Sequence, residues 1–255
     1  MKLSVLKIGG NVLNNPAALY EALDYFASLV EPAVLVHGGG RKASEVIREM
    51  GREPVMVEGR RVTNAQTLEI VTMVYAGLIN KNIVADLQKR GVNALGLSGA
   101  DGNVVLATKR PPGRIDYGYA GDVRGVNGAL LEQFLKLGLR PVLCPITHDR
   151  EGQLLNTNAD TIANEAAVAL AEQGFDVSLR YCFELPGVLA DINDLDSVIP
   201  KITESTYRQY QREGVIAGGM IPKLDNAFEA IERGVAEVRI GDLRALAAGR
   251  GTQLA

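Results

Sequence analysis

The sequence has few of the residues that build covalent cross-links and metal sites. Among 255 residues there are two cysteines, Cys144 and Cys182, and two histidines, His37 and His148. The cysteines form no CxxC pair and no cluster with a histidine, so neither a disulfide scaffold nor a zinc site has support. We expect both thiols to be buried in strands, and we predict no protein-bound metal.

Long apolar runs and clusters of one charge are also missing. No apolar run approaches the roughly 20 residues that span a bilayer, and the apolar part of the opening MKLSVLKIGGN is too short for a secretory signal. The 27 Lys and Arg and 30 Asp and Glu leave a formal net charge of −3, without a basic stripe. We therefore expect a cytoplasmic protein with no nucleic acid and no membrane among its partners.

Two common nucleotide-binding patterns are absent as well. The chain contains neither GxxxxGK[ST] nor GxGxxG. The first absence excludes a standard P-loop kinase, and the second argues against a dinucleotide dehydrogenase.

The patterns that are present indicate an α/β fold. With 47% hydrophobic and 22% charged residues, the chain can build a large core in one domain. Short β-branched runs, such as residues 3–8 and 33–37, alternate with longer helical patterns, including one at 65–89. This alternation predicts a mainly parallel sheet with helices on both faces. Hairpins are expected within residues 103–126, and a weak break is expected near residue 175.

Glycine-rich turns follow several of the predicted strands, including Gly9-Gly10 and Gly38–Gly40. Where a helix starts just beyond such a turn, its free N–H groups favour anions, and glycine lets a ligand approach the backbone. One such turn is equally well explained as a tight connection. Several in one chain favour a phosphate ligand.

Two lysines stand in positions that cost free energy unless an anion meets them. Lys7 lies near the carboxyl end of an apolar strand, where desolvation is expensive and where α/β sheets bind ligands. Lys223 follows AGGMIP at the start of a helix, where its charge opposes the helix dipole. On local evidence alone, the position of Lys7 favours an anion ligand over a lysine at the surface of an edge strand, whereas Lys223 could equally be a surface lysine.

Polar side chains at two further places suit a carboxylate ligand. NTNAD at 156–160 opens a helix, and Asp160 could cap that helix or orient two lysines. Arg61 in EGRRVT suits bidentate carboxylate binding, although the adjacent Arg60 is an equal rival on local sequence.

Together these segments resemble the amino-acid kinase family and, within it, the acetylglutamate kinases. The matching pieces occur in family order: KIGGN at 7–11, VHGGGRKASE at 36–45, GRRVT at 59–63, NTNAD at 156–160 and GGMIPK at 218–223. The resemblance implies a three-layer αβα sandwich formed by a single domain, 1–255. Within it, a lobe at 1–175 would bind the acylglutamate and a lobe at 176–255 would bind ATP.

The resemblance also implies roles for individual residues. Lys7 and Lys223 would stabilise the transferring phosphoryl group, and Asp160 would hold both lysines. The acylglutamate would be bound by Gly39, Gly40, Arg61, Asn156 and Asn158. Phosphate and nucleotide would be bound by Gly9, Gly10, Gly38, Glu184, Gly187, Leu189, Val215 and Ala217.

The implied reaction is phosphorylation of the side-chain carboxylate of N-acetyl-L-glutamate by ATP, for arginine and ornithine biosynthesis. ATP would carry Mg²⁺, and a homodimer would form through the helix at 65–89. A carboxylate is already ionised at pH 7, so no general base is required. The missing histidine base is consistent with this chemistry.

Some features depart from the family pattern and leave the substrate and even the activity open. Phe183 and Glu184 stand where relatives commonly have an SD pair, and the short segment before Lys7 predicts an enzyme without arginine feedback. The acyl group could be succinyl instead of acetyl. The chain could also be a carbamate, aspartate, glutamate or uridylate kinase, a non-catalytic binding protein for an acidic metabolite, or a flavodoxin-like protein with structural glycine turns.

Overall fold

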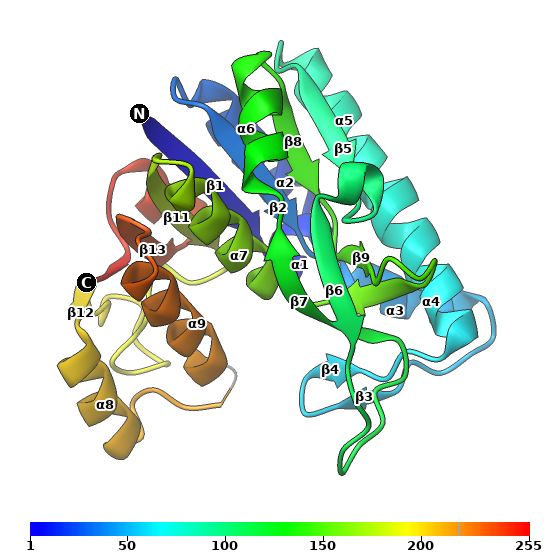
Figure 1. The fold of residues 1–255 in the computed structure, drawn as a ribbon. Helices are drawn as coiled ribbons and strands as arrows, with labels where there is room; N and C mark the ends of the chain where they lie inside the picture. The colour runs from blue at the N-terminus through cyan, green and yellow to red at the C-terminus, as the bar shows by residue number, and fades with distance from the viewer. Residues whose placement is uncertain (219) are drawn as a thin grey trace.

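A central eight-stranded sheet with helices on both faces forms the body of the protein in this computed structural model, which describes residues 1–218 and 220–255 (Figure 1). In sheet order the strands are β12 (Lys201–Ile202), β14 (Thr252–Leu254), β13 (Glu237–Gly241), β11 (Asp176–Cys182), β1 (Lys2–Ile8), β2 (Ala33–His37), β8 (Arg140–Leu143) and β5 (Ala94–Leu97). All neighbouring pairs are parallel except β13 with β14. The predicted mainly parallel α/β sandwich is confirmed.

Two hydrophobic cores lie on opposite faces of this sheet. One is covered by α6 (Gly128–Lys136), α7 (Ala159–Glu172), α8 (Glu204–Arg212) and α9 (Met220–Glu232). The other is covered by α1 (Gly10–Asn14), α2 (Pro16–Ser28), α5 (Asn80–Lys89) and α10 (Leu243–Ala247). Because side chains alternate along a strand, Val5 of β1 enters the first core, while Leu6 and Ile8 enter the second. Lys7 shares the face of Val5 and so points towards α7.

A smaller four-stranded assembly stands below the main sheet in Figure 1. It contains β6 (Val105–Lys109), β7 (Ala120–Val126), β9 (Ile146–His148) and β10 (Leu154–Thr157). The antiparallel pairing of β6 with β7 confirms the hairpin expected within 103–126. A second hairpin, β3 (Met56–Val57) and β4 (Arg60–Arg61), lies beside it. This assembly forms one wall of the site described below.

The long helix predicted at 65–89 is present, but its middle is π-helical. It consists of α4 (Ala65–Thr72), the π turn η1 (Met73–Ile79) and α5. The Asn64 side chain caps its start by accepting a hydrogen bond from the Thr67 N–H at 2.8 Å. By length and composition this 25-residue helix could span a membrane, contrary to the expectation from the apolar runs of the sequence. Val71 and Leu87 are fully buried in the cores, so one face of this helix packs on the body of the protein.

The break expected near residue 175 falls between α7 and β11. However, β11 pairs with β1 along its whole length, from Lys2 with Asp176 to Ile8 with Cys182. The main sheet therefore continues across the boundary of the two predicted lobes, and the division into lobes stays a prediction. Both cysteines are buried, as expected, although only Cys182 lies in a strand, since Cys144 directly follows β8.

Candidate active site

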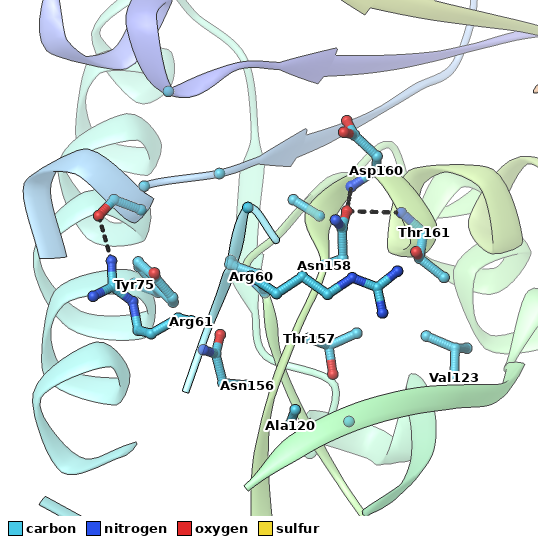
Figure 2. A pocket seen from close by; sticks show the side chains of 18 of the residues that line it. Arg60, Arg61, Tyr75, Ala120, Val123, Asn156, Thr157, Asn158, Asp160 and Thr161 are labelled. Atoms are coloured by element: carbon cyan, nitrogen blue, oxygen red, sulfur yellow. Dashed lines mark hydrogen bonds between the residues drawn. The ribbon is translucent and has the colours of Figure 1, made fainter. Parts of the chain in front are cut away.

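A cavity of about 530 Å³ opens where the carboxyl ends of β1 and β2 meet the start of α7 and the smaller assembly (Figure 2). Its lining includes these predicted site residues: Lys7, Gly10, Gly38, Gly39, Gly40, Arg61, Asn156, Asn158 and Asp160. Two helices begin at its wall, α3 (Gly40–Glu49) and α7. Helix N-termini present unpaired N–H groups and partial positive charge, so this cavity favours an anion.

An ion pair joins the sheet to α7 at this cavity. Lys7 Nζ lies 2.6 Å from Asp160 Oδ1, and Lys7 is 9% exposed. Burial works to raise the pKa of Asp160, but Lys7 and then Lys223 outweigh it and hold that pKa below its usual value. Asp160 is therefore ionised at neutral pH, as its predicted role requires.

The α7 cap is supplied by Asn158 and not by Asp160. The Asn158 side chain accepts hydrogen bonds from the N–H groups of Asp160 and Thr161, at 2.7 and 3.3 Å (Figure 2). A capping amide satisfies N–H groups that would otherwise have no partner in the helix. A capping role for Asp160 is thus excluded, and its carboxylate is available to Lys7.

The structure distinguishes Arg61 from Arg60. Arg61 is 7% exposed, and its Nη2 donates to the Gly40 carbonyl and to Ser44 Oγ, both at 2.7 Å. Its Nη1 is buried without a hydrogen-bond partner among the described residues. Arg60 is exposed and extends across the cavity (Figure 2). A buried, half-satisfied guanidinium is well suited to a carboxylate ligand.

The second glycine turn is shaped by the helix that packs on it. Gly39 has φ +148°, and a Cβ there would lie 2.5 Å from Ile79 and 3.0 Å from Tyr75. Only glycine tolerates both constraints. Gly9 and Gly38 were expected to offer their N–H groups to phosphate, but these donate to the carbonyls of Cys182 and Ile8. The candidate amide donors at these turns are instead those of Gly10 and Gly39.

Lys223 is held differently from Lys7. Its ammonium lies 5.1 Å from the centre of the Phe183 ring, a cation–π contact. Burial lowers the pKa of Lys223, while Asp160 raises it in part. No ion pair to Lys223 is found within residues 1–218 and 220–255. Gly219, in the same GGMIPK motif, lies outside the described residues.

Apart from the glycines of the first two turns, the predicted phosphate- and nucleotide-binding residues lie in the second half of the chain. Glu184 lines a separate hollow of about 370 Å³ and accepts a hydrogen bond from Asn11 at 2.8 Å. Gly187 and Leu189 are buried, and a Cβ on Gly187 would lie 2.6 Å from Val198. Val215 packs against the first core, and Ala217 is exposed. Gly9, Lys223, Gly187, Leu189, Val215 and Ala217 are not among the described residues that line the larger cavity.

Two features of the site could not be singled out in the sequence. Tyr75, 4% exposed, lines the cavity beside Arg61, and burial raises the pKa of its phenol (Figure 2). Asn156 donates to Thr63 Oγ at 2.9 Å, so a threonine near Arg61 orients this amide. Tyr75 looks like any apolar helix residue, and Thr63 has no distinguishing signal beyond its place in GRRVT.

Metal-ligand chemistry is sparse in the part of the chain that the structure describes. It holds no group of three or more His, Cys, Asp or Glu side chains that could bind a metal ion. The Asp160 carboxylate is already engaged by Lys7.

The sequence profile of the amino acid kinase family matches residues 2–242. This chain belongs to the amino acid kinase family. Within the family it is 54% identical over 253 residues to acetylglutamate kinase of Bacteroides thetaiotaomicron, covering 99% of this chain and 98% of that protein. It is 55% identical over 240 residues to acetylglutamate kinase of Cytophaga hutchinsonii, covering 94% and 90%. The resemblance predicted from the motifs is confirmed.

A solved structure shows the family's fold over the whole chain. The crystal structure of smu.665 from Streptococcus mutans UA159 superposes with a TM-score of 0.81 at 30% identity, covering 99% of this chain and 98% of that one. The family fold thus accounts for both the main sheet and the smaller assembly.

Proposed function

We propose that this family member transfers the γ-phosphoryl group of ATP to the side-chain carboxylate of N-acetyl-L-glutamate, a step of arginine and ornithine biosynthesis. The acetylglutamate kinases to which it is similar over nearly full length support this assignment. The structural observation that carries it is the Lys7–Asp160 ion pair lining the same cavity as the buried guanidinium of Arg61. Cations placed at both a reacting and a binding position suit a dicarboxylate acceptor.

In this mechanism the protein positions two anions and neutralises their charge. A carboxylate oxygen of the acceptor attacks the γ-phosphorus, the bond to the ADP oxygen breaks, and no proton has to move. Lys7 and Lys223 stabilise the charge on the transferring group, and Asp160 holds Lys7 in place. The α-carboxylate of the acceptor would accept from Arg61, beside Asn156. Excluding water from the site would protect the acyl phosphate product from hydrolysis.

The proposal also places ATP and the Mg²⁺ that it carries. The nucleotide would lie over the second half of the chain, residues 176–255, near Glu184 and Lys223. Lys223 lies against the ring of Phe183, the residue next to Glu184, which supports placing these two groups at one site. Mg²⁺ would arrive on the phosphates and neutralise part of their charge.

The assembly is proposed to be a homodimer through the helix at 65–89, in the cytoplasm where ATP is available. Met73 and Leu78 on this helix are 55% and 46% exposed, so two large apolar side chains of the helix face outward. A second copy of the chain would cover them.

A coupled ADP-release assay tests the function, with N-acetyl-, N-succinyl- and free L-glutamate as separate acceptors. We expect the highest kcat/KM with N-acetyl-L-glutamate. A higher value with N-succinyl-L-glutamate would reassign the acyl group while keeping the reaction. Turnover with none of the three would overturn the proposal and favour a non-catalytic binding protein.

A further inference from the structure

A buried polar chain links the long helix to the glycine turn of the site. His37, at the end of β2, is fully buried. Its Nδ1 lies 2.8 Å from the Gly38 carbonyl oxygen, and its Nε2 lies 3.1 Å from the Asn80 side-chain nitrogen. The same Asn80 nitrogen lies 3.0 Å from the Val142 carbonyl, and the Asn80 oxygen lies 3.1 Å from Lys81 Nζ.

The hydrogen-bonding chemistry of Lys81 and Val142 determines where each proton lies in this series of hydrogen bonds. A lysine ammonium only donates and a carbonyl only accepts, so the Asn80 oxygen must face Lys81 and its NH₂ must face Val142. The NH₂ then donates to His37 Nε2, which must be unprotonated. His37 therefore carries its single proton on Nδ1 and donates it to the Gly38 carbonyl. Burial, with Lys81 nearby, lowers the pKa of His37 to about 4, which agrees with a neutral ring.

This hydrogen bond sets the direction of the peptide between Gly38 and Gly39. In a trans peptide the C=O and N–H groups point to opposite sides. With the Gly38 carbonyl held by the buried ring, the Gly39 N–H points away from that ring, and Gly39 itself lines the cavity. Among the described residues no acceptor is found for this N–H. It is thus a donor available to a bound anion.

We infer that Asn80 is a positioning residue that acts through His37 to aim the Gly39 N–H at the anionic acceptor. The inference rests on the proposed function, since it assumes that the acceptor occupies the cavity beside Gly39. It also assigns a role to the π turn η1. That turn directly precedes Asn80 and presents Tyr75 and Ile79 to Gly39, so the helix contacts the glycine turn by packing as well as through His37.

Gly96 in β5 makes room for this arrangement. A Cβ at Gly96 would collide with the Asn80 side-chain oxygen and lie 2.8 Å from Lys81 Nζ. Glycine inside a strand commonly marks such a close approach. Gly96→Ala should therefore displace the Asn80 amide without altering His37 or the glycine turn directly.

The first test reads the His37 ring by ¹⁵N NMR of the unligated protein, in which His148 is the only other histidine. We expect the Nδ1–H tautomer of His37 at pH 7, and a growing share of the Nε2–H tautomer in Asn80→Ala and Gly96→Ala. An Nε2–H or doubly protonated ring in the wild type would overturn the inference. Because this readout needs no turnover, it is independent of the proposed function.

The second test compares steady-state kinetics of Asn80→Ala with those of Ile83→Ala, a buried residue one turn along the same helix. Loss of one aimed donor should raise KM for the acceptor in Asn80→Ala about tenfold, the worth of one hydrogen bond. KM for ATP should change little. Equal changes in all constants for both variants would mean that Asn80 only stabilises the fold, and would overturn the inference. An inactive wild type with the expected tautomer would count against the proposed function alone.

Discussion

The two lysines of the proposed phosphoryl site are held in opposite ways by the two halves of the chain. Lys7 sits in a central strand, paired with Asp160 at 2.6 Å and nearly buried. Lys223 sits in the first turn of α9, and its described contact is the face of Phe183. Lys7 is thus held by a short ion pair, whereas Lys223 is held by a weaker contact.

The comparison indicates that Lys7 is positioned before any ligand binds, whereas Lys223 gains an anionic partner only from the bound ligand. The ion pair with Asp160 fixes the Lys7 ammonium, so its position is set before substrate arrives. Partial burial of Lys223 disfavours its charged form and lowers its pKa. A nucleotide phosphate beside Lys223 would offset that effect, which ties its stabilisation to the reaction.

The largest expected effect is on turnover in Lys223→Ala. Removing a charge that acts mainly in the transition state should lower kcat by roughly 10³-fold. The melting temperature should hardly change, because no described ion pair is broken. The matched control is Lys201→Ala, an exposed lysine of the same half. A kcat near the wild-type value would show that Lys223 is not part of the site.

Lys7→Ala should lower the free energy of unfolding more than Lys223→Ala does. It leaves the Asp160 carboxylate partly buried without its partner, which we expect to cost about 2–4 kcal/mol in free energy of unfolding. Chemical denaturation of Lys7→Ala, Lys223→Ala and the exposed control Lys2→Ala measures this. Equal stability of the first two variants would remove this contrast between the two lysines.

Arg61→Lys tests the arginine proposed to bind the acceptor carboxylate. Lysine keeps the charge but cannot bond Gly40 and Ser44 while also reaching a ligand. We expect kcat/KM for the acceptor to fall about 30-fold, corresponding to roughly 2 kcal/mol. Arg60→Lys, on the exposed neighbour, should change it less than about threefold. The reverse order would mean that Arg60 carries the binding role.

The pH dependence of kcat/KM for ATP should report Lys223. Its charged form is the active one and burial lowers its pKa in the free enzyme, so kcat/KM should fall as pH rises, with an inflection below the ordinary 10.5. In Lys223→Arg, whose guanidinium does not titrate in this range, that inflection should move to higher pH. Profiles of both proteins measured between neutral and alkaline pH decide this. An unchanged inflection in the variant assigns it to another group.

The smallest expected effect is that of Phe183→Leu. Removing the ring removes the cation–π contact, worth about 0.5–1 kcal/mol, so kcat should fall about threefold. Phe134→Leu, in α6 against the first core, is the control for loss of aromatic packing. If kcat is the same in both variants as in the wild type, Phe183 does not position Lys223.

Much of the fold followed from local pattern, because strands, glycine turns and helix starts are encoded over short stretches. Lys7 and Asp160 could be singled out individually, since a charged residue in an apolar strand and an acid at a helix start both need a partner. Their contact could not be deduced from local pattern, because 153 positions separate them and only the packing of α7 on β1 brings them together. The π turn was also missed, since its apolar spacing resembles that of an α-helix.

Arg60 and Arg61 show where local sequence stops being informative. Adjacent residues of a strand point to opposite faces, so one arginine must be buried and the other exposed. Which of them is buried depends on how the β3–β4 hairpin packs beside α3, a contact between distant segments. The same holds for His37 and Asn80, which are 43 positions apart.

By itself the sequence determined the α/β architecture, the glycine turns and the identities of the charged residues, because these depend on neighbours a few positions away. The tertiary structure alone decided which charges meet. It paired Lys7 with Asp160, assigned the α7 cap to Asn158, buried Arg61 instead of Arg60, and left Lys223 against Phe183. Electrostatic free energies depend on distance and burial, and both are set only when the whole chain packs.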